Sequence, residues 1–139
     1  MNIAFFLLPK TDVVYINNNS TMRQALERME YHRYSSVPII DDDGKYVGVL
    51  TEGDLLWKMK NTPGLTFMNT EKIRLNEIER HTQNKPVSVN VQMEDLIAQA
   101  AEQNFVSVVD DNGIFIGIVL RSVLIRYCAE RLKSHKTPN

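Results

Sequence analysis

The pattern of hydrophobic and polar positions predicts the same series of elements twice. In the first half, a short apolar strand at Val13–Ile16 precedes a helix with apolar residues at i, i+3, i+4 and i+7, beginning at Met22. In the second half, the segment Val87–Val91 alternates at the period of a strand, and a similar amphipathic helix begins near Met93. Each half therefore opens with a strand followed by a helix.

Two further strands and a closing helix complete each half. Asp43-Gly44 and Asn112-Gly113 lie between apolar segments and favour tight hairpin turns, because these residues tolerate positive φ. We expect strands at 37–40, 46–50, 105–109 and 115–119, and closing helices near 53–60 and 122–133. The fold class is therefore α+β, built from two β-α-β-β-α repeats.

The two halves also match residue by residue, which indicates duplication. The segment Asp41–Leu50 reads like Asp110–Val119 at an offset of 69 residues, and the apolar helix positions match at an offset of 71. The expected organisation is a first repeat at 6–60 with an N-terminal arm at 1–10, a connector at 61–82, a second repeat at 83–133 and a tail at 134–139. Some short helix is expected in the connector, around Glu71–Ile78.

Local signals refine this outline. Thr21 with Gln24 indicates a capping box, and Asn90 is a candidate cap for the helix of the second repeat. Gly48 and Gly117 lie inside strands, where glycine marks either a bulge or the close approach of a ligand or another backbone. The apolar segment 3–8 is expected to form an extra strand or arm that packs on its own module or on a second copy.

Composition narrows the class of protein. The chain has 139 residues, of which 43% are hydrophobic, and a formal net charge of −1, so a disordered chain is excluded. The near balance of charges, without a Lys/Arg cluster, argues against binding to nucleic acid or to an acidic membrane. The chain holds one cysteine and no apolar run long enough for a membrane span, so we expect a soluble cytoplasmic protein.

Two segments carry a family resemblance. Tyr34–Gly44 reads YSSVPIIDDDG, and Gly48–Leu55 reads GVLTEGDL. The chain resembles a tandem of CBS domains, a Bateman module, of the small stand-alone bacterial type. The second repeat departs from the family pattern, because Ser107 replaces the expected proline, and Leu120 and Val123 stand where threonine and aspartate are expected.

The resemblance implies both an architecture and a function. Two repeats of this family pack with pseudo-twofold symmetry and leave two clefts for adenine nucleotides: AMP, ADP, ATP, S-adenosylmethionine or cyclic di-AMP. Such modules form homodimers and pass the ligand signal to a partner protein, without catalysis. The alternative is a ligand-free scaffold or dimerisation module, which the degenerate second repeat favours.

Thr51 and Asp54 are the chief candidate ligand residues. A carboxylate can accept hydrogen bonds from both hydroxyls of a ribose, and a hydroxyl beside helix-start amides suits a phosphate. The alternative is that Thr51 or Asp54 merely caps the helix that follows.

The resemblance assigns the remaining candidates to the two clefts. Cleft one would combine Thr11, Val14, Ser36, Val37 and Pro38 with Arg121 and Ser122, and cleft two would combine Lys85, Val87, Phe105 and Val106 with Thr51 and Asp54. Cleft one lacks a ribose carboxylate, but Arg121 can hold a phosphate, as in small CBS proteins that bind cyclic di-AMP; otherwise that arginine is simply solvated.

No residue pattern indicates enzymatic chemistry, a metal site or a cofactor. The acidic run Asp41–Gly44 lacks the spacing of a calcium loop and is interpreted as a hairpin turn. The three histidines and Cys128 show no spacing for zinc. Trp57 is expected to cover a helix interface rather than to stack on a base.

Overall fold

The computed structural model describes residues 2–135, and its elements fall into two compact units. One is formed by residues 14–85 and is called the 14–85 unit below. The other joins residues 2–13 to residues 86–135 and is called the terminal unit. Among the described residues, no helix is long and apolar enough to cross a membrane.

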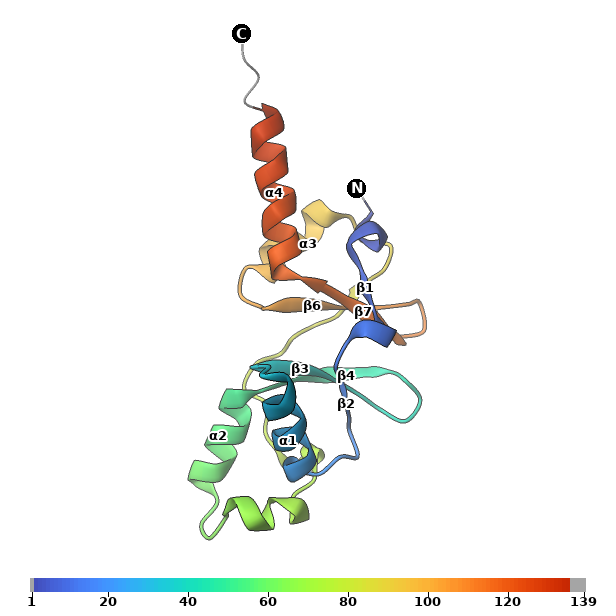
Figure 1. Ribbon diagram of the computed structural model, residues 1–139. Helices are drawn as coiled ribbons and strands as arrows, with labels where there is room; N and C mark the ends of the chain where they lie inside the picture. Colours follow the sequence, from blue (N-terminus) through green and yellow to red (C-terminus); the bar gives the residue numbers. More distant parts are fainter. Residues whose placement is uncertain (1, 136–139) are drawn as a thin grey trace. The chain divides into compact units, whose positions relative to one another are not determined.

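The 14–85 unit contains one three-stranded sheet with helices on one face (Figure 1). Its elements are β2 (Ile16–Asn17), α1 (Met22–His32), β3 (Ser36–Ile40), β4 (Tyr46–Thr51) and α2 (Glu52–Asn61), followed by the 3-10 helices η3 (Phe67–Lys72) and η4 (Leu75–Glu77). The sheet order is β2-β3-β4, with β2 parallel and β4 antiparallel to β3. The connector is part of this unit, since Leu75 and Ile78 are 2% and 4% exposed in its core.

The terminal unit repeats this order and adds an N-terminal strand. Its elements are η1 (Ile3–Phe6), β1 (Leu8–Pro9), η2 (Lys10–Asp12), β5 (Val87–Ser88), α3 (Met93–Ala100), β6 (Phe105–Val109), β7 (Phe115–Leu120) and α4 (Arg121–His135). The sheet order is β1-β7-β6-β5, again with one parallel and one antiparallel pair within the repeat. The α+β class and the twofold β-α-β-β-α order are therefore confirmed.

The hairpins of the two repeats share an irregularity. The β3–β4 register shifts between Ile39 and Ile40, and the β6–β7 register shifts between Val108 and Val109, at the same offset of 69 residues. Gly44 and Gly113 adopt φ of 82° and 80° in the two turns, as the hairpin prediction requires. A shared bulge position supports duplication independently of side-chain identity.

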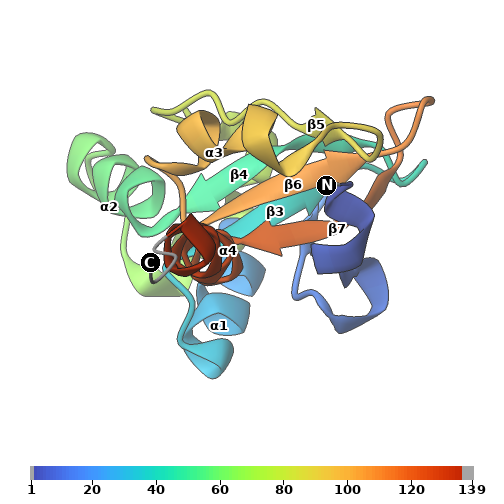
Figure 2. The same cartoon turned by 90° about the horizontal axis from the view of Figure 1, so that it is seen from above.

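The N-terminal arm packs on its own chain (Figure 2). Strand β1 pairs antiparallel with β7, and Ile3 is fully buried in the core of the terminal unit. Gly117 makes this possible, because a Cβ at this position would lie 2.2 Å from the Leu8 carbonyl oxygen. The predicted close approach of another backbone is confirmed at Gly117, whereas Gly48 faces the Arg80 side chain.

The structure corrects three local predictions. The first strand of the 14–85 unit is Ile16–Asn17 rather than Val13–Ile16, because only these two residues pair with β3. Helix α3 has Gln92 rather than Asn90 as its N-cap, and no side chain caps it. The expected strand at 87–91 is regular only over Val87–Ser88. The Val89 N–H still donates to the Val109 carbonyl, but the Val91 N–H turns back to the Ser88 carbonyl, which ends the strand. The capping box of Thr21 and Gln24 is confirmed, with both reciprocal hydrogen bonds present.

A hydrogen bond between α3 and α4 predicts an acid-dependent contribution to stability. The Tyr127 hydroxyl donates to Glu94 Oε1 at 2.6 Å, and mainly this bond lowers the pKa of Glu94 from 4.5 to about 2. A carboxylate with a depressed pKa contributes stability that is present above its ordinary pKa and is lost as the pH falls through the lowered one. This contribution is therefore complete above pH 4.5 and is lost as the pH falls toward 2.

In Tyr127→Phe, the pKa of Glu94 should rise back toward 4.5, because the main donor is gone. An NMR titration of the Glu94 carboxyl carbon measures this shift, with the wild-type protein as the reference. A Glu94 pKa that stays near 2 in the variant would show that Tyr127 is not its cause.

Candidate functional site

The junction between β4 and α2 holds the two chief candidate residues. Thr51 is the N-cap of α2, and its Oγ1 accepts a hydrogen bond from the Asp54 backbone N–H at 3.2 Å. In return, Asp54 Oδ2 accepts from the Thr51 N–H at 3.0 Å. The pair therefore forms a capping box, which satisfies helix-start amides that would otherwise lack partners.

The other oxygen of Asp54 is held by the connector. Asp54 Oδ1 lies 3.0 Å from the His81 backbone N and 3.1 Å from His81 Nδ1. Asp54 is 2% exposed, whereas the His81 side chain is 45% exposed. A carboxylate offers about four acceptor positions, so three are already used within this unit. In this conformation Asp54 caps α2, as the alternative to ligand binding predicts. A ribose that binds Asp54 Oδ1 would have to replace the two His81 donors there.

Neighbouring residues of the connector are fixed beside this junction as well. The Tyr46 hydroxyl donates to the Asn84 carbonyl, and the Arg80 guanidinium covers Gly48. The rings of Trp57 and His81 meet edge to face, with centroids 6.5 Å apart. Segment 80–84 thus contacts both β4 and α2 through several side chains.

Part of the candidate adenine wall lies beside this junction in the sheet. Ser36 is the register partner of Thr51 across the β3–β4 pair, so these two candidates are neighbours. Val37 and Pro38 follow on β3 and are buried, with Val37 in the core of the unit. Val14 packs partly buried against the same core, and Lys85 is exposed at the end of the unit.

The terminal unit carries the other half of the candidates. Arg121 begins α4; its backbone N–H donates to the Asn104 carbonyl at 3.0 Å, and its Nη2 donates to Asn104 Oδ1 at 3.1 Å. Ser122 follows it and is exposed, as is Thr11 on η2. Here the guanidinium is oriented by Asn104, a residue that the sequence did not single out.

The apolar candidates of the terminal unit are mostly core residues. Val87, Phe105 and Val106 are 9%, 8% and 0% exposed. Ser107, which stands where the family has proline, is 3% exposed, and within residues 2–135 its hydroxyl has no hydrogen-bond partner.

His81 was not predicted as a site residue, because 27 residues separate it from Asp54 and no spacing rule connects them.

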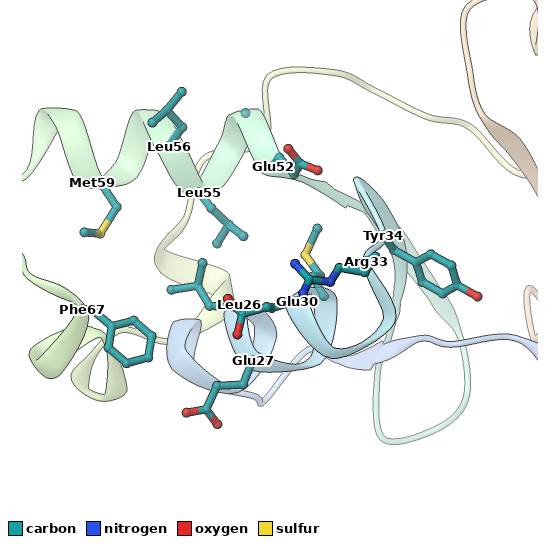
Figure 3. Close-up of a pocket in the computed structure, with 12 residues that line it drawn as sticks. Leu26, Glu27, Glu30, Arg33, Tyr34, Glu52, Leu55, Leu56, Met59 and Phe67 are labelled. Atoms are coloured by element: carbon teal, nitrogen blue, oxygen red, sulfur yellow. The ribbon is translucent and has the colours of Figure 1, made fainter.

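The 14–85 unit also contains a large cavity between α1 and α2, called the α1–α2 groove below (Figure 3). Its volume is about 1000 Å³. The apolar lining side chains are Leu26, Met29, Tyr34, Leu55, Leu56, Met59 and Phe67. The charged lining side chains are Glu27, Glu30, Glu52 and Arg33. Figure 3 shows Leu26 on α1 and Leu55 on α2 pointing toward one another across the groove.

Comparison with known proteins gives relatives along nearly the whole chain. A CBS domain-containing protein of Dictyostelium discoideum is 30% identical over 136 residues, which cover 90% of each chain. The structure of Listeria monocytogenes CbpB in complex with c-di-AMP superposes with a TM-score of 0.81 at 19% identity, covering 94% of this chain and 97% of that one. The structure of CBSX2 in complex with AMP gives a TM-score of 0.73 at 23% identity, covering 93% and 96%.

The two solved structures show a shared fold. The CBS domain model itself matches residues 7–61, which include both segments that carried the resemblance. The relative at 30% identity extends the match over the second repeat. The chain belongs to the CBS-domain family.

Proposed function

We propose that this protein is a regulatory module that binds an adenine nucleotide, acts as a homodimer and signals to a partner protein. The observation that carries the proposal is the Thr51–Asp54 motif at a strand-to-helix junction, where a hydroxyl and a carboxylate lie beside helix-start amides. Structural neighbours with the same fold are described as complexes with c-di-AMP and with AMP, which supports an adenine nucleotide as the ligand.

The proposed ribose contact follows from the geometry of Asp54. Its carboxylate accepts from the Thr51 N–H through one oxygen and from His81 through the other. A ribose presents two adjacent hydroxyl donors, and these can take the place of the two His81 donors on Oδ1. Nucleotide binding at this residue therefore exchanges the His81 contact for the sugar, while the capping box of α2 stays intact.

The Arg121 candidate of the terminal unit is suited to phosphate. The Arg121 guanidinium retains donors beyond the one given to Asn104, because it carries five N–H groups in all. It lies in the first turn of α4, a helix of 15 residues, whose N-terminal amides add to the attraction for an anion. A dinucleotide with two phosphates would place one of them at Arg121 without needing a ribose carboxylate there.

The α1–α2 groove does not suit a nucleotide. Three of its four charged side chains are carboxylates, and these repel the phosphate of any nucleotide. We therefore assign the nucleotide to the junction residues and not to the large cavity.

A scaffold without ligand is the second candidate function. The observation that favours it is that the Asp54 carboxylate is buried and already accepts three hydrogen bonds, two of them from His81. A carboxylate satisfied in this way is stable without a ligand. The two candidates differ in whether any adenine nucleotide binds. Isothermal titration with AMP, ADP, ATP, S-adenosylmethionine and cyclic di-AMP distinguishes them, and absence of binding by all five would support the scaffold.

His81→Ala tests the exchange at Asp54 directly. The substitution removes the ring donor to Oδ1 but leaves the backbone N–H, so AMP should bind roughly fivefold more tightly, from about 1 kcal/mol for one lost competing hydrogen bond. The His81 side chain is 45% exposed, so the fold should tolerate the change. Isothermal titration with AMP measures it, and His32→Ala on α1 serves as the matched control. Equal affinity in His81→Ala and wild type would contradict ribose binding at Asp54.

A further inference from the structure

Asp54 is closed off from solvent, although the proposed function places it against a ribose. The residue is 2% exposed. Its Oδ2 faces the start of α2 and accepts from the Thr51 N–H, whereas its Oδ1 accepts both donors of His81. A ligand that binds this carboxylate therefore requires one of these two sides to move.

The side of Asp54 that faces α2 is costly to open. Thr51 and Asp54 cap this helix reciprocally, so their separation would leave helix-start amides without acceptors. Thr51 is also the last residue of β4, where it is paired with Ser36 of β3. Movement on the side of His81 disturbs neither the cap of α2 nor the pairing of the strands.

Residues 80–84, called the strap below, cover Asp54 on that side without belonging to a helix or strand. Within residues 2–135, the strap makes no hydrogen bond between backbone groups. Contacts that each involve a side chain hold it at three positions: Arg80 lies on Gly48, His81 donates to Asp54, and the Asn84 carbonyl accepts from the Tyr46 hydroxyl.

The strap is poorly anchored compared with the connector before it. His81, Thr82 and Gln83 are exposed. By contrast, Leu75 and Ile78 are 2% and 4% exposed in the core of the unit. Segments with few buried apolar contacts and no regular hydrogen bonds open locally at low free energy. The strap can therefore lift from β4 and α2 while the connector up to Ile78 stays in place.

Building on the proposed function, we infer that the strap closes the Asp54 site and is released when a nucleotide binds. The two ribose hydroxyls occupy Oδ1, and His81 loses its acceptor for both the backbone N–H and the ring. The contacts at Arg80 and Asn84 are then released with it, because the strap moves as one segment. Its position thus depends on the ligand, which gives a regulatory module a conformational change that a partner can recognise.

Trypsin measures the opening directly, because it cleaves after arginine and Arg80 lies in the strap. Cleavage of a segment that opens and closes rapidly follows the population of the open form. The next basic residue, Lys85, precedes Pro86, and trypsin cuts such bonds poorly. Mass spectrometry of the fragments that end at Arg80 or begin at His81 separates this cleavage from all others.

Tyr46→Phe should open the strap without any nucleotide. It removes the hydrogen bond at Asn84, four residues beyond the cleaved bond. The cleavage rate after Arg80 should rise about fivefold, as expected for one lost hydrogen bond. Tyr127→Phe removes a hydroxyl hydrogen bond in the terminal unit and is the matched control, with no change expected. Circular dichroism establishes that both variants are folded. An unchanged rate in Tyr46→Phe would show that the strap does not open as one segment, which overturns the inference.

AMP should raise the same rate in the wild-type protein about fivefold or more at saturation, because both donors of His81 lose their acceptor. The control nucleotide is 2′,3′-dideoxy-AMP, which lacks both ribose hydroxyls and should leave the rate unchanged. Isothermal titration of the same samples measures AMP binding separately. Binding of AMP that leaves cleavage after Arg80 unchanged, or slows it, overturns the strap and leaves the proposed function standing. Absence of AMP binding overturns both.

Discussion

Asp54→Ala should lower the free energy of unfolding by about 2–4 kcal/mol, which is large for a single polar residue. The carboxylate caps α2 through the Thr51 N–H and accepts both donors of His81, and it is 2% exposed. Its removal leaves the Thr51 and His81 donors without the buried acceptor that joins them. The helix start and the connector would both loosen.

Urea denaturation measures this loss, and Asp54→Asn is the matched control. Asparagine keeps one acceptor oxygen at nearly the same volume, so it should retain part of the stability. An Asp54→Ala protein as stable as wild type would mean that the capping box and the His81 contact contribute little. In that case the carboxylate would be available to a ligand at no structural cost.

Gly117→Ala should destabilise the terminal unit by about 3 kcal/mol or more, because strain and overlap act together. The residue has φ of +156°, which L side chains rarely adopt. A new Cβ would also lie 2.2 Å from the Leu8 carbonyl oxygen, an atom of the backbone that cannot turn aside. Strand β1 must therefore leave β7, and Ile3 loses its place in the core.

Gly48→Ala is the control for this effect at the equivalent position. There the new Cβ would lie 2.9 Å from Arg80 Nε, at the end of a flexible side chain that can move. We expect Gly48→Ala to cost less than about 1 kcal/mol. Hydrogen exchange of the β7 amides, together with urea denaturation, follows the release of β1. Equal losses of stability in the two variants would contradict the role given to β1.

Much of the fold was predictable because it rests on local rules. The strands, helices and hairpins follow from periodicity and from turn residues such as Asp43-Gly44, and Thr21 with Gln24 gave a correct helix start. Duplication strengthened each of these predictions, because each element predicted in one repeat could be compared with its equivalent in the other. The cap of α3 was mispredicted because Asn90 and Gln92 are both close to the helix start, and only the backbone decides between them.

The surroundings of the candidate site were less accessible to sequence reasoning. Capping of α2 by Thr51 or Asp54 was an alternative in the sequence analysis, and the structure shows that both residues cap it reciprocally. The contact of Asp54 with His81 depends on how the connector folds back over β4 and α2, and the sequence carries no periodic signal for such a path. The contact of Asn104 with the Arg121 guanidinium likewise depends on the turn of the chain just before β6, for which the sequence gives no spacing rule.

An amide NMR titration with AMP and with cyclic di-AMP tests nucleotide binding at the candidate residues most directly. We predict saturable shifts of the Thr51 and Asp54 amides together with the His81 amide, whose hydrogen bond to Asp54 the ribose would replace, and shifts at Arg121 where a phosphate binds. Spectra that stay unchanged at millimolar nucleotide, or that shift only at residues of the α1–α2 groove, would contradict it.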